Sequence, residues 1–111
     1  MFEYAAKLIK IIDADTIRLD IDLGMRVHII ETVRLIGIDA PELGTIPGQI
    51  ARSFVVKELT AVIAIKIQTT KPEKYGRWLT TLLYLDPAQG PDWRNLNDLL
   101  LSTHHAVPYN P

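Results

Sequence analysis

Residues 16–23 alternate strictly between polar and apolar side chains, with isoleucine or leucine at every odd position. A period of two residues is that of a β-strand with one buried face and one solvated face. Such a strand needs neighbouring strands and a core on its apolar side. Gly24 follows directly and suits a tight turn into a next strand. This segment therefore favours a fold built mainly from β-structure.

Two more segments with the composition of strands flank the alternating one. Residues 5–13 are rich in isoleucine and leucine, and residues 25–38 form a long stretch that we expect to bend near residues 31–32. Only short turns separate the three segments. Consecutive strands joined by short turns predict an antiparallel meander.

A helix and two further strands are expected next. Pro47 suits the first turn of a helix, and apolar residues recur behind it at helical spacing, namely Ile50, Ala51, Phe54, Val55 and Leu59. Residues 62–69 and 78–85 are the expected fourth and fifth strands. In the fourth, one face would carry Ile63, Ile65 and Ile67.

A second helix is expected near the end of the chain, because Asn95 and Asp98 have the spacing of a capping box. The apolar stripe of this helix would consist of Leu96, Leu99 and Leu100. Three strands, a helix, two strands and a helix are the element order of a five-stranded Greek-key barrel of the OB type. We therefore expect a mainly β, α+β fold, with residues 1–111 forming a single domain.

Composition narrows the classes of function. The 111 residues are 48% hydrophobic and 23% charged, as in a folded protein, and the absence of cysteine excludes disulfides and thiolate metal sites. The net charge of −1 argues against a strongly basic nucleic-acid binder. No segment approaches the roughly 20 apolar residues of a membrane span, and no secretory signal is evident. We therefore expect a cytoplasmic monomer without a membrane partner.

Charged residues interrupt or end the expected strands at three places, in the motifs DADT (13–16), VRLIGIDAPE (33–42) and EKYGR (73–77). Taken singly, each suits an ordinary turn or strand end. Taken together, they supply carboxylate oxygens for a hard cation and arginine forks for a phosphate. A further carboxylate can activate water. These are the groups needed to hydrolyse a phosphodiester.

The three motifs, in this order and with this spacing, resemble the staphylococcal nuclease (thermonuclease) family from about residue 8 to residue 109. The resemblance implies an OB-type barrel that binds one Ca²⁺ ion. It also implies cleavage of DNA and RNA, preferably single-stranded, to leave 3′-phosphate and 5′-hydroxyl ends. The choice of Ca²⁺ over Mg²⁺ or Mn²⁺ rests on the resemblance.

The resemblance assigns the cation to one set of residues. Asp15, Asp39 and the backbone carbonyl of Ala40 would ligate Ca²⁺, and Asp13 would orient a bound water. Ala14 stands where the family commonly has glycine. If that position required a positive φ, alanine would cost about 1 kcal/mol.

The resemblance assigns the chemistry to a second set. Glu42 would act as general base or position the attacking water, while Arg34 and Arg77 would bind the scissile phosphate and stabilise its developing charge. The nucleotide would further contact Lys74, Tyr75 and Tyr109. The loop after Glu42 is short and uncharged, so we expect weak, salt-sensitive substrate binding.

Two other functions are compatible with the fold. An OB-type barrel can hold single-stranded nucleic acid without cutting it, and such inactive modules are expected to lose acidic ligands or an arginine. A structural domain could use the carboxylates for Ca²⁺ alone and would not need both arginines.

His28, His104 and His105 lack the spacing of a metal site and are expected at the surface.

Overall fold

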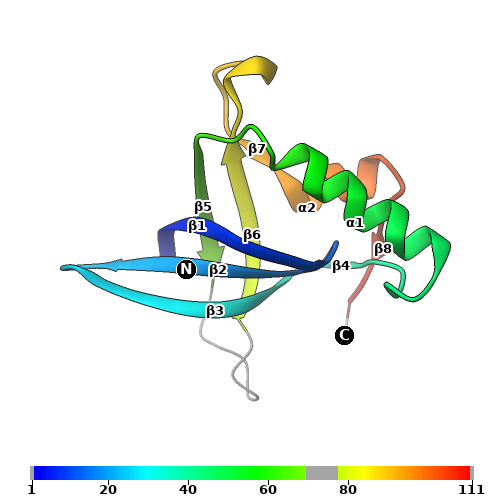
Figure 1. The fold of residues 1–111 in the computed structure, drawn as a ribbon, viewed down its shortest axis with the longest axis horizontal. Coiled ribbons are helices and arrows are strands. Elements are labelled where there is room, and N and C mark those ends of the chain that lie inside the picture. Colours follow the sequence, from blue (N-terminus) through cyan, green and yellow to red (C-terminus); the bar gives the residue numbers. More distant parts are fainter. Residues whose placement is uncertain (1, 70–77, 111) are drawn as a thin grey trace.

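The computed structural model describes residues 2–69 and 78–110. Its long strands are β1 (Phe2–Asp13), β2 (Thr16–Gly24), β3 (Val27–Leu35), β5 (Ala64–Thr69) and β6 (Trp78–Leu85). The first three form the expected antiparallel meander, and β5 pairs antiparallel with both β1 and β6. β6 then pairs in parallel with β3. This last pairing closes a five-stranded mixed barrel (Figure 1).

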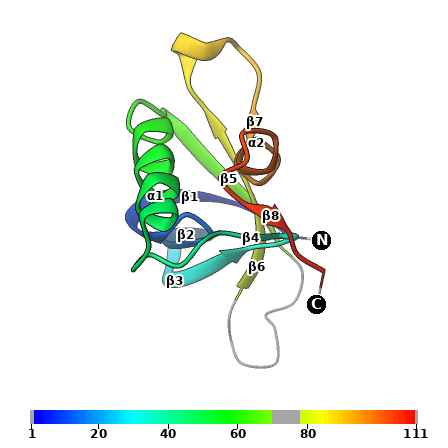
Figure 2. The same ribbon diagram turned by 90° about the vertical axis from the view of Figure 1, so that its right-hand side faces the viewer.

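Two helices and four short elements complete the described part of the chain. The additional elements are β4 (Ile38–Asp39), α1 (Ile46–Glu58), the 3-10 helix η1 (Pro87–Gln89), β7 (Arg94–Asn95), α2 (Leu96–Ser102) and β8 (Val107–Pro108). β7 extends the sheet beside β6, and β4 pairs with β8 (Figure 2). The expected α+β class is confirmed, and the barrel is consistent with the OB type. In the described residues, no helix is long and apolar enough to cross a membrane.

The alternation in β2 produces the core, as predicted. Ile17, Leu19 and Ile21 are completely buried, and the core also contains buried residues from every other long strand and from both helices. Leu23 continues the sequence pattern but is exposed. It lies where the β2–β3 hairpin projects beyond the rest of the barrel (Figure 1). The pattern therefore stops marking the core where the strand leaves it.

The expected third strand, residues 25–38, is too long at both ends. Met25 and Arg26 adopt positive φ angles of 53° and 65° and form the turn of the β2–β3 hairpin. At the other end β3 stops at Leu35, because Gly37 has a φ of 81° and redirects the chain into β4. The turn at Gly37 separates Arg34 from Asp39, whereas the pairing of β3 with β2 continues without a register shift through residues 31–32.

Two isoleucines expected on buried faces are exposed. Ile63 is 68% exposed because β5 begins only at Ala64, and the residue before it belongs to the connection from α1. Ile50 is 56% exposed, since α1 turns Ala51 and Val55 toward the barrel. Ile50 precedes Ala51 and therefore lies about 100° around the helix from it, at the edge of the contact between α1 and the barrel.

The predicted cap of α2 is present, and the helix carries a buried polar anchor that the sequence pattern does not reveal. The Asn95 side chain accepts a hydrogen bond from the Asp98 amide at 3.0 Å. Asn97 is only 5% exposed. Its side chain accepts from the Leu82 amide and donates to the carbonyls of Ile36 and Thr80, at 3.0–3.1 Å. Asn97 thus ties α2 to β6 and to the turn before β4.

Candidate active site

The ends of two neighbouring strands place one arginine between two carboxylates. Arg34 lies next to the end of β3, opposite Thr16 at the start of β2. Its Nη1 donates to Asp15 Oδ2 at 2.9 Å, and its Nη2 donates to Asp39 Oδ1 at 3.2 Å. Nη2 also donates to the Ile38 carbonyl at 3.3 Å. Asp15, Arg34 and Asp39, here named the acid–arginine cluster, therefore converge as the sequence predicted.

The acid–arginine cluster becomes more exposed from Asp15 outward. The side chains of Asp15, Arg34 and Asp39 are 5%, 18% and 52% exposed. Asp15 is also fixed by the Ala40 amide, which donates to Oδ2 at 3.0 Å, and by the Thr16 hydroxyl, which donates to Oδ1 at 3.1 Å. Asp15 is thus a fixed carboxylate, whereas Asp39 faces solvent.

Electrostatics keep Arg34 charged. Burial alone would lower the pKa of Arg34, but the negative charge of Asp15 and the hydrogen bonds to Asp39 and Asp15 raise this pKa above its ordinary value. The guanidinium is therefore cationic at neutral pH.

The two residues before Asp15 differ in their surroundings. Burial and then the negative charge of Asp15 raise the pKa of Asp13, and Arg52 and Arg34 oppose this only in part. Ala14 is buried, and it is not among the described non-glycine residues with a positive φ. The alanine in place of glycine therefore causes no backbone strain here.

Tyr109 contacts the acid–arginine cluster from the end of the chain. Pairing of β4 with β8 aligns Asp39 with Val107, and the Tyr109 amide donates to the Gly37 carbonyl at 3.0 Å. The guanidinium carbon of Arg34 lies 5.7 Å from the centre of the Tyr109 ring. An exposed aromatic ring beside a cation can stack on a nucleobase.

Glu42 lies three residues after Asp39, with its side chain exposed. Its carbonyl accepts hydrogen bonds from the amide and the hydroxyl of Thr45, at 3.0 and 2.6 Å. Among the described residues, its carboxylate forms no hydrogen bond or ion pair. Arg77, Lys74 and Tyr75 lie outside the described residues, so their assigned roles stay predictions.

A small cavity opens beside Asp39 on the side of α2. Its volume is about 180 Å³, and its walls come from residues 39–41 and 104–107. His28 and His104 are exposed, as expected, but His105 is half-buried and its ring stacks on Phe54 with centroids 4.1 Å apart. No local pattern indicates this contact, because the two residues are 51 positions apart in the sequence.

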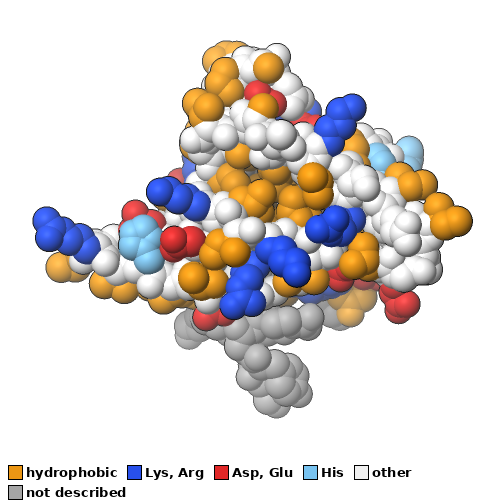
Figure 3. All heavy atoms as spheres, viewed as in Figure 1, with side chains coloured by type: hydrophobic (Ala, Val, Ile, Leu, Met, Phe, Trp, Pro, Cys, Tyr) orange, Lys and Arg blue, Asp and Glu red, His pale blue; other side chains and the backbone are white. Residues whose placement is uncertain are grey.

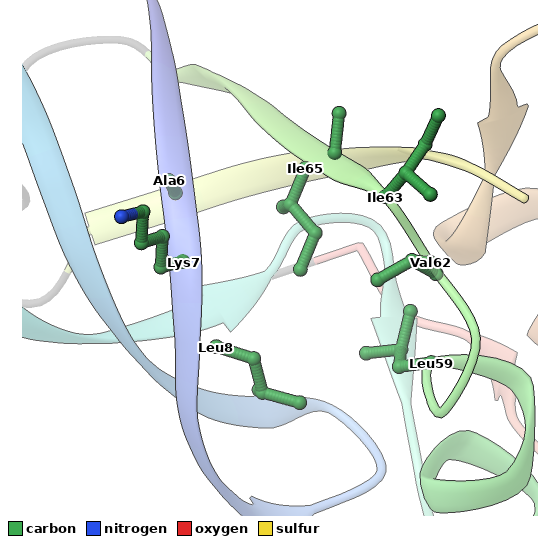
Figure 4. Close-up of a pocket in the computed structure, with 8 residues that line it drawn as sticks. Ala6, Lys7, Leu8, Leu59, Val62, Ile63 and Ile65 are labelled. Carbon is green, nitrogen blue, oxygen red and sulfur yellow. The ribbon is translucent and has the colours of Figure 1, made fainter.

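A second hollow is apolar and lies elsewhere on the barrel. It measures about 260 Å³ and lies between β1 and the segment from Leu59 to Ile65 (Figure 4). On the face drawn in Figure 3, apolar side chains gather near the centre, with Lys and Arg side chains spread around them. Lys7 is the one charged residue among those that line the hollow. The lining therefore offers no carboxylate or imidazole that could bind a metal ion.

Asp15 and Asp39 carry carboxylate oxygens, which are the ligand type that a hard divalent cation prefers. Asp15 and Asp39 come within hydrogen-bonding distance of the same guanidinium, and the Ala40 backbone adjoins them. In residues 2–69 and 78–110, no group of three or more His, Cys, Asp or Glu side chains could hold a metal ion. Two carboxylates and a carbonyl would leave the other coordination positions to water. A cation here would also compete with Arg34 for both carboxylates.

We compared the chain with models of known protein families and with curated protein sequences, and neither comparison finds a match.

Proposed function

We propose that the protein is a divalent-cation-dependent nuclease that hydrolyses phosphodiester bonds of single-stranded DNA or RNA. The observation that supports this most strongly is the position of Arg34. Its guanidinium lies between the carboxylates of Asp15 and Asp39, with Tyr109 beside it, where β2 begins and β3 ends. Phosphate binding, cation binding and base stacking would then share one surface.

The described residues suggest a division of labour. Asp15, Asp39 and the Ala40 carbonyl would hold Ca²⁺, which would supply positive charge to the scissile phosphate. Arg34 would bind the same phosphate through its planar fork and stabilise the transition state. Glu42 would accept a proton from the attacking water. Its carboxylate is exposed, and no described side chain forms a hydrogen bond or ion pair with it.

The resemblance to the staphylococcal nuclease family implies which bond would break. A P–O bond forms to the water oxygen, and the bond from phosphorus to the 5′ oxygen breaks. The leaving oxygen takes up a proton, and the products carry a 3′-phosphate and a 5′-hydroxyl. Loss of one preorganised donor such as Arg34 typically lowers the rate about 10²–10³-fold.

The second candidate is a module that binds single strands without cutting them. The structure offers one observation in its favour, which is that Arg34 already pairs with both carboxylates. A phosphate could approach Arg34 and Tyr109 without any cation. This candidate predicts binding that is independent of Ca²⁺.

The two candidates separate in a cleavage assay. Wild-type protein, Glu42→Gln and the control Glu31→Gln are incubated with single-stranded DNA, in Ca²⁺ or in chelator. Glu31 lies on β3 and is half-buried, and no role in the reaction is assigned to it. Cleavage that needs Ca²⁺, persists in Glu31→Gln and falls at least about a hundredfold in Glu42→Gln supports the nuclease. Binding without cleavage supports the module.

A further inference from the structure

Gly48 lies in the first turn of α1, where the helix packs directly on the backbone of Glu42. It is buried, and a Cβ atom at this position would overlap the Glu42 carbonyl group. The same atom would lie 2.9 Å from the Pro41 carbonyl oxygen. Because both neighbours are backbone, they cannot give way by changing a rotamer. Only glycine permits this approach.

Thr45 joins the two segments by hydrogen bonds. Its amide and its hydroxyl both donate to the Glu42 carbonyl, and its hydroxyl oxygen accepts from the Gly48 amide at 3.1 Å. Thr45 is therefore the N-cap of α1 and the anchor of Glu42 at once. Threonine is among the residues preferred at an N-cap, so the cap itself is a local feature of the sequence. The contact between Thr45 and the Glu42 carbonyl becomes visible only in the folded structure.

The helix that carries this contact is itself fixed to the barrel. Ala51 and Val55 are buried in the core, and Arg52 Nε donates to the Ile11 carbonyl at 3.0 Å. On the other side of Glu42, the Ala40 amide donates to Asp15. The segment that carries Glu42 is thus held at both ends, by the acid–arginine cluster and by α1.

We propose that Gly48 is a positioning residue for Glu42. The close packing of α1 sets where the backbone of Glu42 lies relative to Asp39, and hence where its carboxylate can meet water. This proposal rests on the proposed function. Glycine is otherwise unfavourable in a helix, so its place at the third position of α1 is explained by the contact with Glu42.

The test compares Gly48→Ala with Gly44→Ala. A Cβ atom at Gly44 would meet no atom within 4 Å, and Gly44 has no positive φ, so it is a matched control in the same loop. Gly48→Ala should shift the Glu42 backbone by about 1 Å, which typically lowers kcat about a hundredfold. We expect KM to change little and Gly44→Ala to keep wild-type kcat. Circular dichroism checks that both variants fold.

A double variant shows whether Gly48 acts through Glu42. In a Glu42→Gln background, Gly48→Ala should cause no further loss of kcat, because the group that it positions is already gone. If Gly48→Ala does not fold, Thr45→Val removes the hydroxyl contacts at nearly constant shape and should show the same non-additive loss. Additive losses would overturn the positioning role.

Failure of the proposal differs from failure of the proposed function. If wild-type protein cleaves single-stranded DNA in Ca²⁺ but Gly48→Ala cleaves equally well, only the role of Gly48 is overturned. If wild-type protein does not cleave in Ca²⁺, the proposed function falls, and the role of Gly48 falls with it.

Discussion

Replacing Arg34 by methionine removes the cation of the acid–arginine cluster while retaining much of the side-chain volume. The Asp15 carboxylate would lose a charge-assisted hydrogen bond of 2.9 Å but keep the donors from Ala40 and Thr16. Such a bond to a buried charged group contributes about 1.5–3 kcal/mol. The pair with the exposed Asp39 adds at most about 1 kcal/mol.

We therefore expect Arg34→Met to lower the free energy of unfolding by about 2–3 kcal/mol in chelator. For a domain of this size, that corresponds to a fall in Tm of roughly 10 °C. Ca²⁺ should raise the Tm of the variant more than that of the wild type, because the two carboxylates no longer have a competing guanidinium. Cleavage should nevertheless fall about 10²–10³-fold, since the phosphate loses its donor.

Thermal unfolding followed by circular dichroism, with and without Ca²⁺, measures both effects. Arg18→Met is the control, because Arg18 is an exposed arginine on β2. It should leave the Tm and the Ca²⁺ response unchanged. The reasoning is refuted if Arg34→Met keeps the wild-type Tm in chelator, or if Ca²⁺ stabilises the variant and the wild type equally.

Three further predictions concern the rest of the structure. Tyr84 donates to Glu58 at 2.6 Å, and burial followed by this hydrogen bond raises its pKa to about 12. Tyr84→Phe should therefore cost about 1–2 kcal/mol at neutral pH. Because the raised pKa favours the neutral phenol in the folded state, the wild type should lose stability as the pH rises from 10 to 12. Urea unfolding should show no such loss in Tyr84→Phe. Asn97→Leu removes three hydrogen bonds to backbone groups, although the Thr80 carbonyl keeps the Ile36 amide as a donor, and should cost about 1–3 kcal/mol in the same experiment. Glu42→Gln should bind single-stranded DNA with a log–log salt slope of about −1.4 by fluorescence anisotropy, as expected for two phosphate contacts, and a much steeper slope would mean a larger cationic surface.

Much of the fold could be predicted from local patterns. The alternation that ends in a buried Ile21, the strand at residues 78–85 and the cap at Asn95 depend on near neighbours in sequence, so periodicity and capping chemistry reveal them. The ends of helices and strands were harder to predict from the sequence. The exposed Ile63 matches the strand pattern, and its position is set by where the chain leaves α1.

The site divides in the same way. Residues that carry charge at strand ends could be selected from the sequence, and Asp15, Arg34 and Asp39 do converge. Contacts that depend on packing could not. The approach of Gly48 to the Glu42 carbonyl requires α1 to be placed on the barrel, and no local signal in the sequence describes that placement.

The most direct test of the account is cleavage of an end-labelled single-stranded oligonucleotide by wild-type protein and Asp39→Asn, in Ca²⁺ and in chelator. The account predicts that wild-type protein produces 3′-phosphate ends in Ca²⁺ only, and that Asp39→Asn is slower by about a hundredfold or more. Cleavage that continues in chelator, or that is unchanged in Asp39→Asn, would contradict it.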